Sequence, residues 1–242
     1  MNDTIKQLFD RKSVRVFEDR EISKEDKQLI LEAATMAPTA GNQQLYTILD
    51  ITDQELKDQL VVTCDNQPFI AKAKMVLIFC ADCKKWYDGF LATDCEPRLP
   101  GAGDLLLAGS DAVIAAQNAV VAAESLGIGS CYIGDIMENC EKQRELLHLP
   151  TYVFPAAMLV FGYPTKQQIE RKKPERAPLK HIVHENEYRQ MEPEELEAMF
   201  DQRSGEKTYI DYMKAFCNRK YNSDFSKEMS RSVSEYLKDF AK

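Results

Sequence analysis

The sequence predicts a mixed fold of helices and strands, in which helices and single strands alternate irregularly. Three short strands are predicted at residues 46–51, 75–80 and 156–161, and helices of unequal length separate them. This order is not the regular strand–helix–strand repeat that builds a parallel sheet. The chain has 242 residues, 44% of them hydrophobic, which suffices for one domain of ordinary size or two small ones.

The N-terminal elements follow from capping residues and breakers. A short amphipathic helix is predicted at residues 3–10 and a loop or extended segment at 11–17. Ser23 is a good N-cap for a helix at 24–36, which ends before Pro38 because the residue before a proline disfavours the helical conformation. After it come a polar loop at 38–44, the strand 46–51, a helix at 53–62, the strand 75–80 and a surface loop at 88–103.

A long helix is predicted at residues 104–126, apolar around most of its girth and rich in alanine. Such a helix is buried on all sides, either in a domain core or against a partner subunit. Because it contains Asp111, Gln117 and Glu124, it is a poor membrane span. After it come an extended run at 130–133, a helix at 138–147, the strand 156–161, a basic loop at 165–178, an edge strand at 180–184 and two polar helices from 192, joined at 203–207.

Charge and cysteine content limit the partners and the compartment. The net charge of −8 argues against broad binding to nucleic acid or to anionic membranes. The N-terminus lacks the apolar run of a secretory signal, and seven cysteines without framework spacing indicate free thiols in a reducing compartment. We therefore expect a cytoplasmic protein that binds neither nucleic acid nor membrane.

Several common catalytic motifs are absent. The sequence has no P-loop, no HExxH, no GxGxxG after a strand and no recognisable nucleophile signature. Cys80 and Cys83 form a CxxC after a strand, where we expect packing and not redox chemistry. His181 and His184 would point to opposite faces of the predicted edge strand, so we expect no metal site.

Two polar clusters are candidate ligand contacts. Arg11, Lys12, Ser13 and Arg15 place three cations and a hydroxyl within five residues, which suits a phosphate or a solvated basic turn. The loop from Thr39 to Gln44 offers amide groups that suit the edge of a flavin or a base, although alone it is a polar turn.

In combination these strings resemble the nitroreductase superfamily. RKSVRVFEDREIS is followed by ILEAATMAPTAGNQQ, then by DAVIAAQNAVVAAESLGIGSCYIGDI, LLHLP, LVFGYP and HENEY, in that family's order. The resemblance covers roughly residues 4–188, and the helical tail is similar to that of the NADPH-linked nitroreductase and flavin reductase subgroup.

The resemblance implies an α+β fold, with a mixed, mainly antiparallel sheet flanked by helices in an intertwined homodimer. It implies one domain over residues 1–242, with a helical excursion from about 190. It also implies two FMN sites at the subunit interface, and an apolar helix at 104–126 agrees with burial in a dimer.

The resemblance also implies contacts for each part of FMN. Arg11, Lys12, Ser13 and Arg15 would hold the phosphate and ribityl region, and Lys173 and Arg176 would also reach the phosphate. The string RKKPER has an extra residue before Arg176, so Lys172 competes for this role. The expected ring and ribityl contacts are Thr39, Asn42, Gln67, Tyr132, Ile133, Gly134 and Asp135.

The activity implied is transfer of two electrons from NAD(P)H through FMN to nitro-aromatics, quinones or free flavins. No catalytic side chain is expected, because the cofactor carries the chemistry. Arg203 and Lys207 would select NADPH by its 2′-phosphate, with Glu206 partly cancelling their field. Alternatives are a flavin-dependent dehalogenase, a flavin-fragmenting relative or a flavin-binding sensor without turnover.

Overall fold

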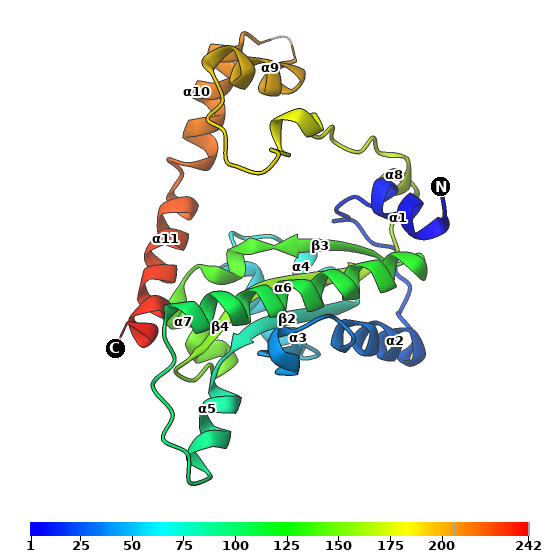
Figure 1. The fold of residues 1–242 in the computed structure, drawn as a ribbon. Coiled ribbons are helices and arrows are strands. Elements are labelled where there is room, and N and C mark those ends of the chain that lie inside the picture. Colours follow the sequence, from blue (N-terminus) through cyan, green and yellow to red (C-terminus); the bar gives the residue numbers. More distant parts are fainter. Residues whose placement is uncertain (206, 242) are drawn as a thin grey trace. The chain divides into compact units, whose positions relative to one another are not determined.

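The structure is a computed structural model that describes residues 1–205 and 207–241, and it divides into two compact units. The first unit contains Met1–Arg171 and Glu228–Lys242, and the second contains Lys172–Lys227. The elements, drawn in Figure 1, are α1 Asp3–Asp10, α2 Lys24–Thr35, η1 Ala40–Asn42, β1 Tyr46–Asp50, α3 Gln54–Thr63, α4 Phe69–Lys72, β2 Met75–Asp82, α5 Lys84–Leu91, α6 Ala102–Ser125, β3 Gly129–Ile133, η2 Gly134–Met137, α7 Cys140–Leu147, β4 Val153–Gly162, α8 Lys166–Glu170, η3 Leu179–His181, α9 Pro193–Ser204, α10 Tyr209–Lys220, α11 Asp224–Leu237 and η4 Lys238–Phe240.

The first unit is built on a four-stranded sheet of order β1-β2-β4-β3. All three pairings between its strands are antiparallel, which confirms the predicted α+β class with a mainly antiparallel sheet. The register shifts between Phe79 and Cys80, where Cys80 lies opposite Pro155. Proline has no backbone N–H to give to the ladder, so a bulge at this point avoids a lost hydrogen bond.

Both faces of the sheet are covered, because successive side chains of a strand point to opposite sides. Leu77 and Phe79 lie in the cluster that packs against α2 and α6. Val76 and Ile78 lie in a second cluster with residues of α3 and α4, on the other face. All four side chains are 0% exposed, which explains why β2 has no polar alternation in its sequence.

The central helix α6 is buried on one side and apolar on the other. Figure 1 shows it running along the sheet, and Ala112, Ala115 and Ala116 are buried in the core. Leu106 is 74% exposed and Val113 45%, so the core of the single chain buries only one face of α6, and the expected burial of the other face against a partner subunit stays a prediction. Among the described helices, α6 alone is long and apolar enough to cross a membrane, but the core helix of a soluble protein passes the same test.

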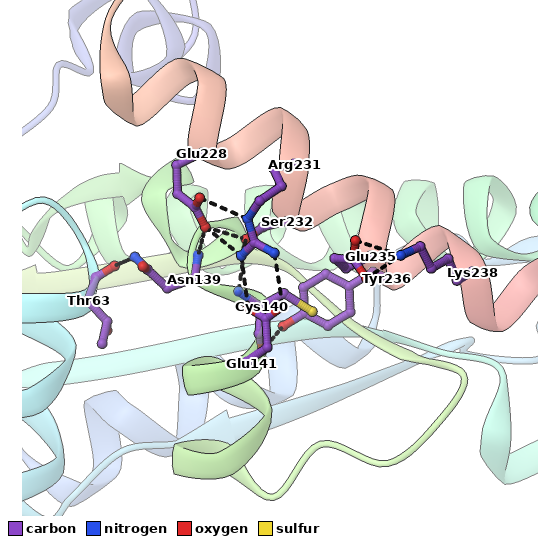
Figure 2. Close-up of polar contacts among 10 residues, drawn as sticks. All are labelled: Thr63, Asn139, Cys140, Glu141, Glu228, Arg231, Ser232, Glu235, Tyr236 and Lys238. Atoms are coloured by element: carbon purple, nitrogen blue, oxygen red, sulfur yellow. Dashed lines mark hydrogen bonds and ion pairs between the residues drawn. The ribbon is translucent and has the colours of Figure 1, made fainter.

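The last helix, α11, begins in the second unit and ends in the first, where it binds α7. Figure 2 shows Arg231 bound to Glu141 at 2.8 Å and to Glu228 at 2.8 Å. The Ser232 hydroxyl accepts a hydrogen bond from the first backbone N–H of α7, that of Cys140, at 2.9 Å. The second unit is therefore an insertion whose two ends both join the first unit.

Several predicted boundaries differ from the structure. Helix α5 occupies the start of the loop expected at 88–103, and α8 lies inside the loop expected at 165–178. The edge strand expected at 180–184 is wrong: η3 ends at His181, and the residues after it pair with no strand in the described chain. In the described residues after 192 there are three α-helices, α9, α10 and α11, where two helices were expected.

Candidate functional site

The basic segment 11–17 lies along the edge of the sheet that β3 forms. Ser13 pairs with Ser130 in a parallel bridge, and Phe17 pairs with Pro164 in an antiparallel one. The chain is thus held in an extended form at two points. In extended backbone, every second side chain points the same way. Arg11, Ser13 and Arg15 therefore share one side of the segment.

Two glycines permit this close approach. A Cβ atom added at Gly129 would lie 2.6 Å from Val14 Cγ2, and one added at Gly162 would lie 2.7 Å from the Phe17 ring. Both distances are shorter than any ordinary contact of a Cβ atom. Glycine at these two positions therefore leaves the space into which Val14 and Phe17 of the basic segment pack.

The Arg11 guanidinium lies beside β3 with unused donors. Its Nε and Nη2 atoms are buried and find no hydrogen-bond partner among the described residues, and its Cζ atom lies 5.9 Å from the centre of the Tyr132 ring. Burial raises the pKa of the Cys131 thiol, while Arg15, Ser13 and Arg11 oppose that shift. The three expected phosphate-binding side chains of this segment therefore gather around one point.

This arrangement fits a phosphate group. A buried cation with unpaired donors is costly unless an acceptor binds it. The Ser130 hydroxyl is also buried without a hydrogen-bond partner in the described chain, and it follows Gly129 at the same edge. Guanidinium and hydroxyl donors at one sheet edge suit the oxygens of a phosphate monoester such as that of FMN.

Lys12 points elsewhere, and a residue that the sequence did not single out supports the segment. The Lys12 ammonium donates to the carbonyl oxygens of Ile169, at 2.5 Å, and Arg171, at 2.6 Å. The Arg171 guanidinium donates back to the Ser13 carbonyl at 2.6 Å. Lys12 and Arg171 thus tie the basic segment to the end of α8. The only sequence signal for Arg171 was its place at the head of RKKPER.

The turn between α3 and α4 brings Gln67 to the same region. Its amide nitrogen donates to the Cys64 carbonyl at 2.9 Å and to the Asp135 carboxylate at 3.0 Å. Two residues on, the Phe69 ring lies 5.9 Å from the Arg15 guanidinium. Gln67 and Asp135, which the resemblance assigned separately, are therefore bonded to each other.

The residues from Tyr132 to Asp135 turn from β3 into η2. Ile133 is buried, and Gly134 begins η2. Burial raises the pKa of the Tyr132 hydroxyl to about 12, with the Arg11 charge opposing, and that hydroxyl donates to Gln117 at 3.3 Å. Tyr132 is therefore a neutral donor at physiological pH.

The loop that contains Thr39 and Asn42 is fixed by a buried acid on α6. Asp111 is 3% exposed and accepts hydrogen bonds from the Thr39 hydroxyl, from Ala40 N at 3.1 Å and from Leu45 N at 3.2 Å. Asn42 adopts a φ of 57°, which asparagine tolerates better than most residues. Sequence reasoning missed Asp111, although an acid in so apolar a helix was the signal for it.

The second unit holds the other expected contacts. A cavity of about 490 Å³ is lined by Lys172, Lys173, Pro174, Glu175, Arg176, Arg203, Tyr212 and Phe216. Its aromatic wall is a tilted pair, with the Tyr212 and Phe216 rings 5.7 Å apart. The structure thus brings Lys173 and Arg176 together with Arg203. Lys207 is exposed, with its backbone N–H on the Ser204 carbonyl, and Glu206 lies outside the described residues.

A cavity of about 420 Å³ in the first unit was not anticipated from the sequence. Trp86, Tyr87 and Phe90 of α5 line it, and the Trp86 indole donates to the Gln43 carbonyl at 2.7 Å. This bond joins the aromatic wall to the loop that Asp111 holds.

Cys80 and Cys83, the two thiols of the CxxC, are both buried. Burial raises the pKa of both Cys80 and Cys83 to about 12, so neither is a thiolate at neutral pH. All seven cysteines lie in the described chain and are free. No group of three or more metal-binding side chains occurs among the described residues.

Comparisons with known proteins find relatives that match this chain over most of its length. The FMN reductase (NADPH) of Bacillus subtilis is 32% identical over 250 residues, covering 100% of this chain and 97% of the relative. The oxygen-insensitive NADPH nitroreductase of Salmonella typhimurium is 35% identical over 206 residues, covering 85% and 82%.

Solved structures also match this chain over nearly its whole length. NfrA2 of B. megaterium superposes with a TM-score of 0.80 at 30% identity, covering 98% of each chain. The NADPH:FMN oxidoreductase of Vibrio harveyi, complexed with NAD⁺, superposes with a TM-score of 0.79 at 25% identity, covering 99% of each chain. The model of the Nitroreductase family matches residues 8–163, and this chain therefore belongs to the nitroreductase family.

Proposed function

We propose that this protein is an FMN-dependent NAD(P)H oxidoreductase that reduces nitro-aromatics, quinones or free flavins by two electrons. The observation that carries the proposal is the Arg11 guanidinium, whose buried Nε and Nη2 atoms have no acceptor among the described residues. Similar proteins are an FMN reductase and an NADPH nitroreductase, which supports both the cofactor and the co-substrate.

The chain's own groups would bind and orient the cofactor. Arg11, Ser13 and Arg15 would hold the phosphate and ribityl region, with Lys12 positioning the segment through its bonds to the carbonyls of Ile169 and Arg171. Gln67 and the turn from Tyr132 through Ile133 and Gly134 to Asp135 would line the ring. FMN held by these residues would supply the redox chemistry, namely transfer of two electrons from the nicotinamide to the acceptor.

The cavity of the second unit supports a preference for NADPH over NADH. Arg176 and Arg203 line it together with Tyr212 and Phe216. Guanidinium groups suit the 2′-phosphate that only NADPH carries, and the aromatic rings offer a stacking surface for adenine. The FMN affinity of Arg176→Ala separates this role from the FMN-phosphate role that Lys173 and Arg176 would otherwise have.

The active form would be a homodimer. Exposed apolar side chains occur on α1 and along α6, and they include Phe9 at 67% and Leu106 at 74%. Large exposed apolar surfaces are rare on monomeric proteins and mark interaction sites. A partner covering this face could also bring the loop of Thr39 and Asn42 to the second flavin site. Sedimentation should show a dimer, and a flavin-loaded monomer would contradict this assignment.

The purified protein's visible spectrum tests the cofactor. Two flavin bands, with FMN and not FAD released on denaturation, are the expected result. Steady-state oxidation of NADPH with menadione or nitrofurazone then tests turnover. Bound flavin without acceptor-dependent oxidation would favour a sensor, and reductive loss of halide from a halogenated aromatic would favour a dehalogenase.

We propose the cytoplasm as its location, together with small molecules as its substrates. The seven free cysteines fit a reducing compartment, and the net charge of −8 disfavours nucleic acid.

A further inference from the structure

Glu138 is a buried carboxyl group that none of the assigned contacts uses. It follows η2, its side chain is 3% exposed, and its Oε1 atom has no hydrogen-bond partner among the described residues. An isolated buried carboxylate is costly, so such a group either finds a cation or keeps its proton. The surroundings of Glu138 decide between these outcomes.

The charged groups that face Glu138 are mostly acidic. They come from η2, from the turn after α3 and from α11, and they are Asp135, Asp65 and Glu228. Burial, followed by the charges of Asp135 and Asp65, raises the pKa of Glu138 to about 7. Arg231, the cation that binds Glu228, also binds Glu141 and is therefore already paired. The buried Cys64 thiol, which also lies near, carries no charge at neutral pH.

Asp135 connects Glu138 to Gln67. Besides burial, the negative charge of Asp135 contributes to the raised pKa of Glu138, and the Glu138 backbone N–H donates to the Asp135 carbonyl at 3.0 Å. Asp135 Oδ2 accepts from Gln67 Nε2 at 3.0 Å, while the same nitrogen donates to the Cys64 carbonyl at 2.9 Å. Both amide hydrogens of Gln67 are thereby used, which leaves its Oε1 atom as the group it can offer to a ligand.

We propose that Asp135 and Glu138 hold one proton between them, and that this proton positions Gln67 toward the flavin. With the proton present, Glu138 donates to Asp135, and the anionic Asp135 holds the amide nitrogen of Gln67. Without it, two adjacent carboxylates repel each other, and Asp135 leaves Gln67. This inference rests on the proposed function only in that Gln67 faces FMN; the shared proton itself does not require the cofactor.

The first test uses the protein without FMN. Carboxyl carbons labelled with ¹³C should show one group that titrates near pH 7 in the wild type. That titration should disappear in Glu138→Gln and persist in Glu145→Gln, a matched change of an exposed glutamate on α7. No carboxyl titrating between about pH 6 and 8, or one that survives Glu138→Gln, overturns the shared proton.

The second test measures the Kd of FMN from about pH 6 to 8.5. The wild type should bind about fivefold more weakly at the upper end, the loss that one hydrogen bond accounts for. Glu138→Gln donates at every pH and should show no such dependence. Asp135→Asn should bind FMN with an affinity that does not change with pH, because a neutral asparagine is not repelled by the Glu138 carboxylate.

The two tests separate the possible failures. A wild type that binds no FMN at any pH contradicts the proposed function, while the carboxyl titration still stands or falls by itself. A carboxyl that titrates as expected, combined with FMN affinity that does not change with pH, overturns the coupling to Gln67. Lower stability of Glu138→Gln with the wild-type pH dependence of Kd would mean a structural role only.

Discussion

The two compact units of this chain are held together in different ways. The first unit has apolar clusters on both faces of its sheet. In the described part of the second unit, His181 and Ser204 alone are buried, while Ile182 is 66% exposed and Tyr188 83%. Caps and surface ion pairs, such as Arg189 with Glu195 at 2.6 Å, shape the second unit instead. Surface ion pairs contribute little stability, so the described part of the second unit should open more easily than the first.

Truncation of a core side chain should show the largest difference between the units. Leu77 is 0% exposed in β2, and Leu77→Ala should lower the free energy of unfolding by about 2–5 kcal/mol. The matched change Ile182→Ala in the second unit should cost less than about 0.5 kcal/mol. Chemical denaturation measures both. An equal loss in the two variants would show that a partner chain buries Ile182 and would remove the contrast.

Arginine substitutions should show that the first unit binds FMN and that the second unit binds NADPH. Arg11→Ala should weaken FMN binding by about 1.5–3 kcal/mol, the range for hydrogen bonds to charged groups, and leave the KM for NADPH unchanged. Arg203→Ala should raise the KM for NADPH roughly ten- to a hundredfold, with NADH and FMN unaffected.

Fluorescence of free flavin gives the FMN affinity, and steady-state rates with both nucleotides give the KM values. Two results would break this assignment: unchanged cofactor retention in Arg11→Ala, or a preference for NADPH that survives Arg203→Ala.

The glycine at the sheet edge should have a smaller effect on stability. Gly129→Ala places a Cβ atom 2.6 Å from Val14 and should cost about 1–3 kcal/mol as the basic segment shifts. It should also weaken FMN binding, because Arg11 and Ser13 move with that segment. Gly103→Ala is the control: it meets nothing within 4 Å and lies inside α6, where alanine is the better helix former. Equal FMN affinity in both variants would show that FMN binding does not depend on how the basic segment lies at the sheet edge.

The ion pairs that join α11 to α7 should have the smallest effect. Hydrogen bonds from Arg231 hold the pKa values of Glu141 and Glu228 at about 2. Because these values lie below those of the unfolded chain, the stabilisation is present above about pH 4.5 and is lost as the pH falls toward 2. Arg231→Gln should lower Tm by about 1–4 °C at pH 7 and flatten its fall in acid. Arg219→Gln in the second unit is the control. If the Tm of Arg231→Gln falls in acid as steeply as that of the wild type, the ion pairs of Arg231 do not contribute to stability.

Sequence reasoning succeeded where burial repeats along the chain. The strands around Leu77 and Leu159 and the helix around Ala115 have periodic or continuous apolar patterns, and the structure has them within a few residues of the prediction. It failed at residues 180–184, where polar and apolar residues alternate without a sheet to receive them. Alternation predicts a strand only if a neighbouring strand is available to pair with it.

The site was predictable as a set of residues, while their pairings were not. A resemblance can point to Gln67 and Asp135 separately, but the bond between them depends on how the turn after α3 meets η2. Similarly, Arg11 and Lys12 are neighbours in a basic run, and only the extended backbone sends their side chains to different partners. Glu138 had no local signal, because its significance comes from three other elements.

The return of α11 to the first unit also affects how the protein is made. Arg231 binds Glu141 across a separation of 90 residues, and Tyr236 covers Phe154 with its ring. A ribosome adding about 5–20 residues per second needs roughly 5 to 20 seconds to synthesise that stretch. During this interval Phe154 and the N-terminus of α7 lack their cover, and a nascent chain in that state is exposed to aggregation. The exposed stage of synthesis therefore lies between the emergence of α7 and that of α11.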